Sequence, residues 1–319
     1  MMAIDSLRET MPIARISRTM EIPRSTIYYR GRESTGSRKA RIPGNVETEI
    51  KRIAEERTTY GYRRIWAMLR NSGINVNIKA VRRIMRRNSL SLPYAKHRNH
   101  TRTRDLTKPD DVNKLWETDI HYVSLQSEGM AYLMSIKDCF SKKWISYEFS
   151  KSCTASDAIR AVEKAFAIRF HGTLPQNLVL RTDNGPQYIS REFSNTIKIL
   201  GIRQEYIQKH TPEDNGDIES FHSSLKTDYI WVTDIETFED AKKLMEYAFT
   251  DYNTVRPHSS IEYLPPDEFE GRCAEDGNYR KKYLEDRKNK EERRMNNRIE
   301  KKRRLKENVS LEDKKSVQN

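Results

Sequence analysis

The chain has 319 residues and a formal net charge of +13, with 33% charged residues, a length that suits two or three domains and a substantial buried core. No apolar run reaches the length of a membrane span and no signal peptide is evident, so we expect a soluble, cytoplasmic protein with no membrane partner. The scattered cysteines Cys139, Cys153 and Cys273 favour free thiols in a reducing compartment over a disulfide framework or a zinc site.

The charge is unevenly distributed along the chain. Residues 1–108 and 279–319 are strongly basic, whereas residues 109–278 are net acidic. Basic flanks around an acidic middle suit a protein that grips a polyanion at its ends and holds cations in its centre. On charge alone, lysines and arginines that only solvate helices remain an equal alternative.

Residues 12–30 are predicted to form a short helix, a turn and a second helix that Ser25 would cap. This pattern is typical of a helix-turn-helix, in which Arg24 and Ser25 would lie at the surface that meets DNA. A structural hairpin of two helices has the same pattern and remains the alternative. Residues 31–45, rich in Gly, Ser, Arg and Pro, are predicted to be a linker.

Residues 46–90 carry apolar side chains at helical spacing in three short segments, which predicts a compact helical DNA-binding unit. Gly73 is expected to end the second helix, and the third places five cations outside its apolar stripe. These cations can meet a DNA groove or phosphates, with a solvated basic face as the alternative. They are Lys79, Arg82, Arg83, Arg86 and Arg87. A polar, basic linker follows at residues 91–110.

From Lys114 the periodicity changes to that of β-strands. Three strand candidates in succession are followed by alternating helices and strands, which predicts an α/β fold with a mixed five-stranded sheet and helices on its faces. The expected strands are 114–125, 129–140, 143–150, 177–183 and 202–208, and the expected helices are about 154–171, 191–200, 215–230 and 236–253.

The last segment, residues 279–319, consists mainly of Lys, Arg, Glu and Asn. Its few apolar positions predict a charged helical or disordered basic tail. A non-specific DNA or RNA arm is the alternative.

Three carboxylates stand in unusual local contexts. Asp119 lies in the middle of an expected strand, where an acid is costly unless it is paired or holds a metal. Asp183 lies at the end of a strand, before a turn that lifts it to the rim of the sheet. Glu219 lies within an expected helix. Three such oxygen ligands can surround a pair of hard cations, which is what metal-assisted phosphodiester chemistry requires.

Several polar residues near these acids are candidates for DNA contact. Lys226 follows Glu219 by two helical turns on the same face, where it would meet a phosphate. Asn184 and Gln187 can shape a DNA path beside Asp183, or merely form a turn. His210 can contact the scissile phosphate, or merely cap the helix that follows.

Other residues near the acids are expected to have structural roles. The polar cluster of Asn253, Arg256 and His258 is expected to support the core rather than touch DNA. Trp116 and Tyr122 are expected to pack in the core.

Six motifs together carry a family resemblance that covers roughly residues 46–270. The chain resembles the transposases of bacterial insertion sequences with a retroviral-integrase-type catalytic core, specifically the second-reading-frame product of the insertion-sequence-three group. The motifs are YGYRRIWAMLRNSG, VNIKAVRRIMRRNSL, WETDI, RTDNGPQY, TPEDNGDIESFHSSLK and YNTVRPHSSIEYLPPDEF.

The resemblance implies an RNase H-like fold, with Asp119, Asp183 and Glu219 as a catalytic triad that binds two Mg²⁺ or Mn²⁺ ions. It also implies a homo-oligomer acting on double-stranded DNA, namely the terminal inverted repeats of a mobile element and its target. A first-reading-frame protein is implied as a partner or fusion, and the nucleoid of a bacterium as the location.

These observations predict a four-part organisation. A helix-turn-helix-like segment and linker at 1–45 and a helical DNA-binding domain with a basic linker at 46–108 precede the catalytic core at 109–271 and a charged tail at 272–319.

The predicted activity is metal-dependent strand cleavage and strand transfer at the ends of the element, by hydrolysis and then transesterification. Two rival functions remain. One is a catalytically silent DNA-binding regulator derived from a transposase, and the other is a nuclease of the same fold that cuts without joining.

Overall fold

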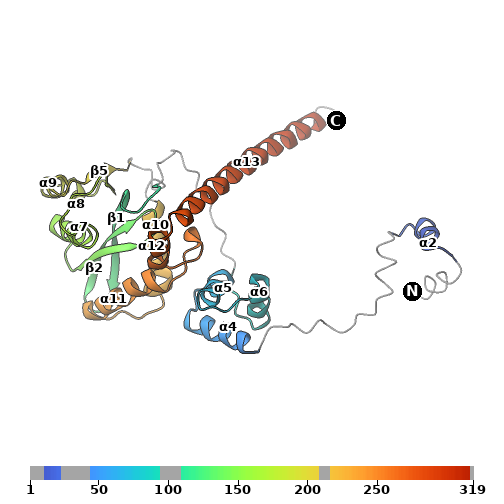
Figure 1. The fold of residues 1–319 in the computed structure, drawn as a ribbon, viewed down its shortest axis with the longest axis horizontal. Helices are drawn as coiled ribbons and strands as arrows, with labels where there is room; N and C mark the ends of the chain where they lie inside the picture. The colour runs from blue at the N-terminus through green and yellow to red at the C-terminus, as the bar shows by residue number, and fades with distance from the viewer. Residues whose placement is uncertain (1–10, 23–43, 94–108, 208–215, 317–319) are drawn as a thin grey trace. The chain divides into compact units, whose positions relative to one another are not determined.

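A computed structural model describes four stretches of the chain, residues 11–22, 44–93, 109–207 and 216–316 (Figure 1). The chain divides into two compact units, residues 1–49 and 50–319, and each is described by itself. No helix among the described residues is long and apolar enough to cross a membrane.

In the first unit, helix α2 (Ile13–Thr19) is the short helix expected from the sequence. It buries Ile16 against Ile13 and Ile22, and the Ser17 hydroxyl donates a 2.7 Å hydrogen bond to the Ile22 carbonyl. The second helix expected here, with Arg24 and Ser25, lies outside the described residues.

Three helices form the helical region that the sequence predicts. Helix α4 (Gly44–Glu56) begins in the first unit and ends in the second, where α5 (Tyr62–Asn71) and α6 (Ile78–Arg87) pack against each other. The Trp66 indole N–H donates a 3.0 Å hydrogen bond to the Val76 carbonyl and so fastens the turn between α5 and α6. Gly73 has a φ of +81° in that turn, a conformation that glycine adopts without steric cost.

Five strands form one mixed sheet in the order β3-β2-β1-β4-β5, which confirms the predicted fold class. β1 pairs antiparallel with β2, and β2 with β3, while β4 is parallel to both β1 and β5. The strands are β1 (Leu115–Leu125), β2 (Gly129–Asp138), β3 (Trp144–Ser150), β4 (Val179–Thr182) and β5 (Arg203–Tyr206).

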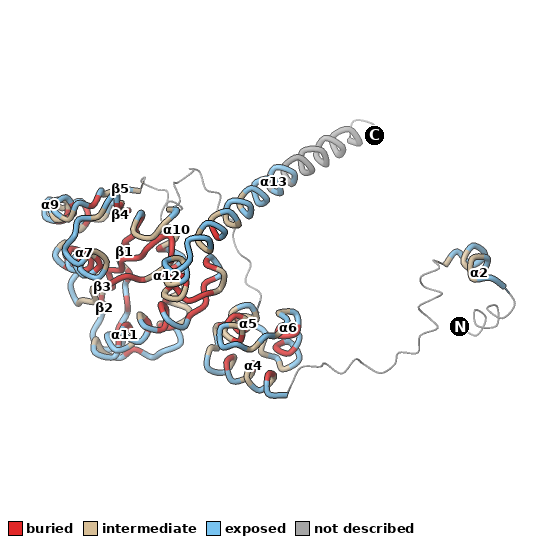
Figure 2. Tube along the Cα trace, viewed as in Figure 1, coloured by how far each residue is buried: buried red, intermediate tan, exposed pale blue. Residues whose placement is uncertain are grey.

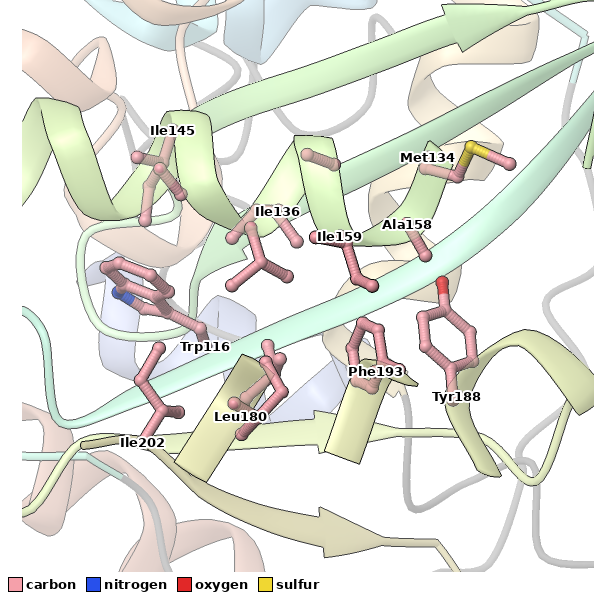
Figure 3. Close-up of a cluster of buried hydrophobic side chains, with 14 of the residues drawn as sticks. Trp116, Met134, Ile136, Ile145, Ala158, Ile159, Leu180, Tyr188, Phe193 and Ile202 are labelled. Atoms are coloured by element: carbon pink, nitrogen blue, oxygen red, sulfur yellow. The ribbon is translucent and has the colours of Figure 1, made fainter. Parts of the chain in front are cut away.

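One face of the sheet is closed by an apolar core under helix α7 (Ala155–Phe170). Trp116, Ile136 and Leu180 project from three neighbouring strands toward α7 and its neighbours (Figure 3). The short helix α8 (Pro186–Ile189) and helix α9 (Arg191–Ile199) complete this layer. A full capping box at Thr154 fixes where α7 begins along the chain.

The opposite face is covered by α10 (Gly216–Leu225), a π-helical turn (Lys226–Ile230) and α11 (Phe238–Thr254). Trp144 is fully buried on this side and packs edge-on against Phe221, Phe249 and Tyr252. The sheet is therefore a middle layer between two layers of helices, with buried residues concentrated in its strands (Figure 2).

Most of the polar cluster expected to support the core does so. The Asn253 side chain hydrogen-bonds both backbone groups of Trp144, at 3.0 and 2.9 Å. Arg256 is buried and pairs with Asp228 at 2.8 Å, and His258 is buried beside Tyr252.

Tyr122 corrects one sequence-based expectation. Trp116 is fully buried as predicted, but Tyr122 is 58% exposed. Toward the end of β1, buried and exposed residues alternate, and Tyr122 occupies one of the exposed positions. Its aromatic character and its place in a strand therefore did not imply burial.

The C-terminal segment is one long helix that starts inside a buried cluster. Helix α12 (Pro266–Glu275) is followed by α13 (Gly277–Ser316). Tyr283 of α13 packs against Phe140 and Phe269, and its hydroxyl donates a 3.0 Å hydrogen bond to the Ser260 carbonyl. Of the two forms expected for the tail, the structure shows the helical one.

Within the second unit, arginines of the α4–α6 region pair with buried acids of the α10–α11 region. Arg57 hydrogen-bonds Asp251 at 3.0 Å, and Arg64 pairs with Asp228 at 3.1 Å. Asp228 also pairs with Arg256, so each of these buried carboxylates has at least one cationic partner.

The contrast between buried and exposed tryptophans gives a test of this packing. We expect Trp144→Ala to lower the free energy of unfolding by about 3–5 kcal/mol, because it empties the centre of an aromatic cluster. Trp231→Ala removes a side chain that is 71% exposed and should change it by less than about 0.5 kcal/mol. Urea unfolding of both variants, followed by circular dichroism, measures the difference, and equal effects would contradict this description of the core.

Candidate active site

Asp119 and Asp183 lie side by side on neighbouring strands. The parallel register of β1 and β4 pairs Glu117 with Arg181, and continuing it by two residues places Asp183, just past β4, beside Asp119. Burial raises the pKa of the Asp183 carboxyl, and the charge of Asp119 raises it further. The Gly185 N–H, which donates a 2.9 Å hydrogen bond to Asp183 Oδ1, acts in the opposite direction and lowers this pKa. Two like charges this close repel each other unless a cation or proton lies between them.

This acidic pair fits a divalent cation. Both groups offer hard oxygen ligands, and the Asp119 side chain is 27% exposed, so an ion can reach it. Within the described residues, no lysine or arginine forms an ion pair with either carboxylate, and the basic groups near Asp119 are His121 and His222. A cation or a proton bound between the two acids would relieve their repulsion.

Glu219 lies on α10, the helix that covers the sheet face toward which Asp119 points. His222 lies one helical turn after Glu219, and its Nδ1 is 3.4 Å from Asp119 Oδ2. Residues three apart share one face of a helix, so the face that carries Glu219 is turned toward Asp119. The Glu219 side chain is exposed.

Two histidines form the wall beside Asp119. The rings of His121 and His222 lie 5.1 Å apart. Burial, then the charges of His222 and Lys226, lower the pKa of His121 to about 3, so this imidazole is neutral near neutral pH. A His222 tautomer with its proton on Nδ1 can donate to Asp119, while its buried Nε2 has no partner in the described part of the chain.

The start of α10 is anchored to a row of charges that crosses the sheet. Lys137, Glu117, Arg181 and Glu205 occupy paired positions on β2, β1, β4 and β5. Arg181 pairs with Glu117 at 3.0 Å and with Glu205 at 3.1 Å, and the first three side chains are nearly completely buried.

This row, which we call the ionic row, holds α10 through its first turn. The Ile218 N–H donates a 2.9 Å hydrogen bond to Glu117 Oε2, and Lys137 Nζ donates one of 2.8 Å to the Asp217 carbonyl. Because an unpaired N–H at a helix start has few other partners, these bonds fix where α10 begins. They therefore fix the position of Glu219, one residue after Ile218.

A second group of possible metal ligands lies beside the ionic row and is a poor metal site. Glu117, Cys139 and Asp217 bring ligand atoms within 4.8 Å of one another, the one such group of three in the described residues. Lys142 already pairs with Asp217 at 2.9 Å, and Arg181 with Glu117. Burial raises the pKa of the Cys139 thiol far above its ordinary value, so a thiolate ligand is disfavoured.

Two of the other residues predicted around the acids, Asn184 and Gln187, have partners within the protein. Asn184 Nδ2 donates a 2.9 Å hydrogen bond to the Ile207 carbonyl, and Gln187 Nε2 donates to the Cys153 carbonyl at 3.0 Å. Lys226 opens the π-helical turn after α10 and is near enough to His121 to affect its pKa. His210 lies outside the described residues.

The basic face predicted for the third helix of the α4–α6 region is exposed on α6. Its apolar residues Val81, Ile84 and Met85 are buried, and its five predicted cations all face solvent. The exposed cations are Lys79, Arg82, Arg83, Arg86 and Arg87.

Sequence reasoning missed three residues of the site, Glu117, His121 and His222. The signal for Glu117 was available, because Glu117 and Asp119 alternate on one face of β1 and two acids on one buried face need partners. His222 follows Glu219 by one turn, which also could have indicated its place.

Comparisons with known proteins agree with this architecture. Residues 109–212 and 200–266 match family models of the integrase core domain, and residues 45–98 match that of an HTH-like domain. The transposase for insertion sequence element IS904 of Lactococcus lactis subsp. lactis (strain IL1403) is 31% identical over 240 residues, which covers 70% of this chain and 93% of that protein. The putative transposase InsK for insertion sequence element IS150 of Escherichia coli (strain K12) is 28% identical over 282 residues, covering 84% and 97%.

A solved structure gives a weaker match. A chain of the simian T-cell lymphotropic virus intasome, determined in complex with PP2A regulatory subunit B56 gamma, is 20% identical. It covers 70% of this chain and 74% of that chain, with a TM-score of 0.44.

The turn after Asp183 gives a first test of the site. A Cβ on Gly185 would lie 3.0 Å from Asp183 Oδ1 and 3.2 Å from Gln187 Oε1, although its φ of −63° suits alanine. We expect Gly185→Ala to weaken the Gly185 N–H bond and so to raise the pKa of Asp183 further. A carboxylate NMR titration measures this, with Gly271→Ala, whose Cβ meets nothing within 4 Å, as the control. An unchanged Asp183 titration would show that the turn tolerates the methyl group.

The ionic row gives a second test. We expect Glu117→Gln to lower the free energy of unfolding by about 3–5 kcal/mol, because it leaves buried cations uncompensated. It should also speed hydrogen exchange at the Ile218 amide. Glu205→Gln removes the same charge from the other partner of Arg181, but that side chain is 38% exposed, so a loss of about 0–1 kcal/mol and an unchanged Ile218 amide are expected. Equal effects of the two substitutions would contradict the role of Glu117 as the anchor of α10.

Proposed function

We propose that this chain, which belongs to the insertion-sequence transposases with an integrase core domain, cleaves and joins DNA strands. The strands it acts on are proposed to be those at the ends of a mobile element. What supports the proposal is the strand register that sets Asp119 beside Asp183, together with the contact of His222 on α10 with Asp119. No covalent intermediate with the protein is required for such phosphoryl transfer.

The three acids are proposed as the ligands of divalent cations, Mg²⁺ or Mn²⁺. Bound there, two such ions supply Lewis-acid polarisation of the scissile phosphate and lower the pKa of an attacking water. The protein's own part is positional. The strand register holds Asp119 beside Asp183, His222 orients the Asp119 carboxylate, and the ionic row sets where α10 presents Glu219.

The remaining polar residues are proposed to hold the DNA. Lys226, seven residues after Glu219 and at the start of the π-helical turn that continues α10, is proposed to meet a phosphate near the scissile one. Asn184 and Gln187 border Asp183, although their amide nitrogens are hydrogen-bonded within the protein. His210, Arg24 and Ser25 are proposed from sequence alone.

Helix α6 is proposed to contact the ends of the element. Its exposed cations lie opposite a buried apolar stripe, which is how a recognition helix presents itself to a groove. The basic cluster supplies phosphate contacts, and the sequence it reads depends on the DNA itself.

The broader organisation is also a proposal. We propose the four parts 1–45, 46–108, 109–271 and 272–319 as functional segments, and a homo-oligomer that brings together two ends and a target duplex. A first-reading-frame protein is proposed as a partner or fusion, and the bacterial nucleoid as the place of action.

The activity is tested by measuring the rates of strand cleavage and of strand joining on a labelled duplex. The sequence of this duplex is taken from the DNA that flanks the coding sequence. With Mg²⁺, we expect Asp183→Asn and Glu219→Gln to lower both rates by roughly 100-fold or more, the scale on which loss of one catalytic group acts. Glu163→Gln, an exposed glutamate on α7, should leave them unchanged.

The same assay separates the rival functions. Cleavage without joining would indicate a nuclease. Binding without any metal-dependent chemistry in the wild type would indicate a silent regulator. Full activity of Glu219→Gln would refute the proposed triad.

A further inference from the structure

A basic cleft lies beside the start of α10, apart from the three acids. It has a volume of about 300 Å³ and is bordered by the turn after β2, by residues 259–260 and by one face of α13. Arg287, Lys290 and Arg294 come from that face, at the spacing that places helical residues above one another. Asp217 lines the other side, two residues before Glu219.

The cations on the α13 side are not neutralised by the protein. Arg287 donates a 2.9 Å hydrogen bond to the Pro109 carbonyl, which carries no formal charge. Lys290 and Arg294 are exposed and form no ion pair within the described residues. By contrast, Lys142 on the opposite wall is already paired with Asp217 at 2.9 Å.

The acids of α13 near the cleft lie mostly on its other faces. In the stretch that borders the cleft, the cleft face carries Arg287, Lys290 and Arg294 with one acid, Glu291, which has a partner of its own. The acids Glu285, Asp286 and Glu292 do not line the cleft. Lys288 and Arg293 lie outside the cleft, so the cleft side of this stretch differs from its other faces in having fewer acids rather than in having all the cations.

The first turns of α13 are anchored to the core, which sets the position of the helix backbone that carries these cations. Tyr283 is buried among Phe140 and Phe269, and the Tyr279 hydroxyl donates a 2.6 Å hydrogen bond to Glu262. Arg280 pairs with Asp111 at the same place. Cations on an anchored helix lose less conformational entropy on binding than those on a free arm.

We propose that this cleft binds the phosphodiester backbone of DNA and guides a strand toward α10. The proposal rests on the proposed function and deepens it by adding a second DNA contact to the catalytic core. Arginine and lysine side chains on one wall suit phosphate oxygens, and such contacts position a duplex without reading its sequence. Asp217 and Glu219 are about 3 Å apart along the helix axis, so a backbone in the cleft runs close to the catalytic helix.

The test is the salt dependence of binding by the full chain to a labelled duplex, measured in EDTA so that no chemistry is needed. Each phosphate contact that is lost should lower the slope of log K against log[salt] by about 0.9. We expect the double variant Lys290→Gln/Arg294→Gln to lower the slope by about 1.8. The matched control Lys288→Gln/Arg293→Gln changes the same charge on exposed positions outside the cleft and should keep the wild-type slope.

Chemical labelling of lysines gives a second readout at single residues. Bound duplex should protect Lys290 from acetylation and leave Lys281, Lys282 and Lys288, on the same helix, as reactive as in the free protein. Equal slopes for the two double variants, or equal protection of all four lysines, would refute DNA binding by the cleft. Neither result would bear on the proposed catalytic role of the acids. Loss of cleavage in Asp183→Asn does not enter this measurement, so the two proposals fail separately. A wild type that binds no duplex would overturn both.

Discussion

A salt bridge in the middle of the sheet, between Glu117 and Arg181, is the constraint on which the site depends. It joins β1 to β4, the two strands that carry or precede the catalytic candidates Asp119 and Asp183. The second oxygen of Glu117 holds the backbone of α10 at Ile218. One carboxylate thus ties together all three elements that bear the acids.

Such an arrangement costs stability in general, because buried charges lose hydration that their attraction only partly repays. Apolar side chains of similar volume could close this face of the sheet more cheaply, as Trp116 and Leu180 do on the other face. What charges add is direction, since hydrogen bonds of fixed geometry set the rotation and the start of α10 in a way that apolar contacts do not. One face of the sheet therefore stabilises the fold by apolar burial, and the other fixes the position of α10.

The sequence predicts the sheet well because strand alternation is a local property. The three successive strands and the helices after them correspond closely to β1–β3 and to α7, α9 and α11. The pairing of Glu117 with Arg181 is different, because it joins residues 64 positions apart and depends on the parallel register. No local pattern contains that register, so the ionic row could not be seen.

Burial of single side chains was also harder to predict than the elements that carry them. Trp116 and Tyr122 both lie in β1, yet the first is buried and the second is exposed, because α7 covers one face near Trp116 while the far end of the strand is open. His222 shows the opposite case, in which a polar residue is buried because its helix face turns toward Asp119. Contacts between layers decide both.

The length of α13 has a consequence for how that helix forms. Helix α13 has 40 residues, and those at 288–297 are mostly exposed, so this stretch gains little from burial and must draw its stability from local propensity and from how the helix is started. The cluster around Tyr283 supplies the start, because docking the first turns there offsets the unfavourable nucleation step. The outer turns then only need to propagate. Loosening that cluster would therefore unwind the helix from its base, far beyond the few residues that touch the core.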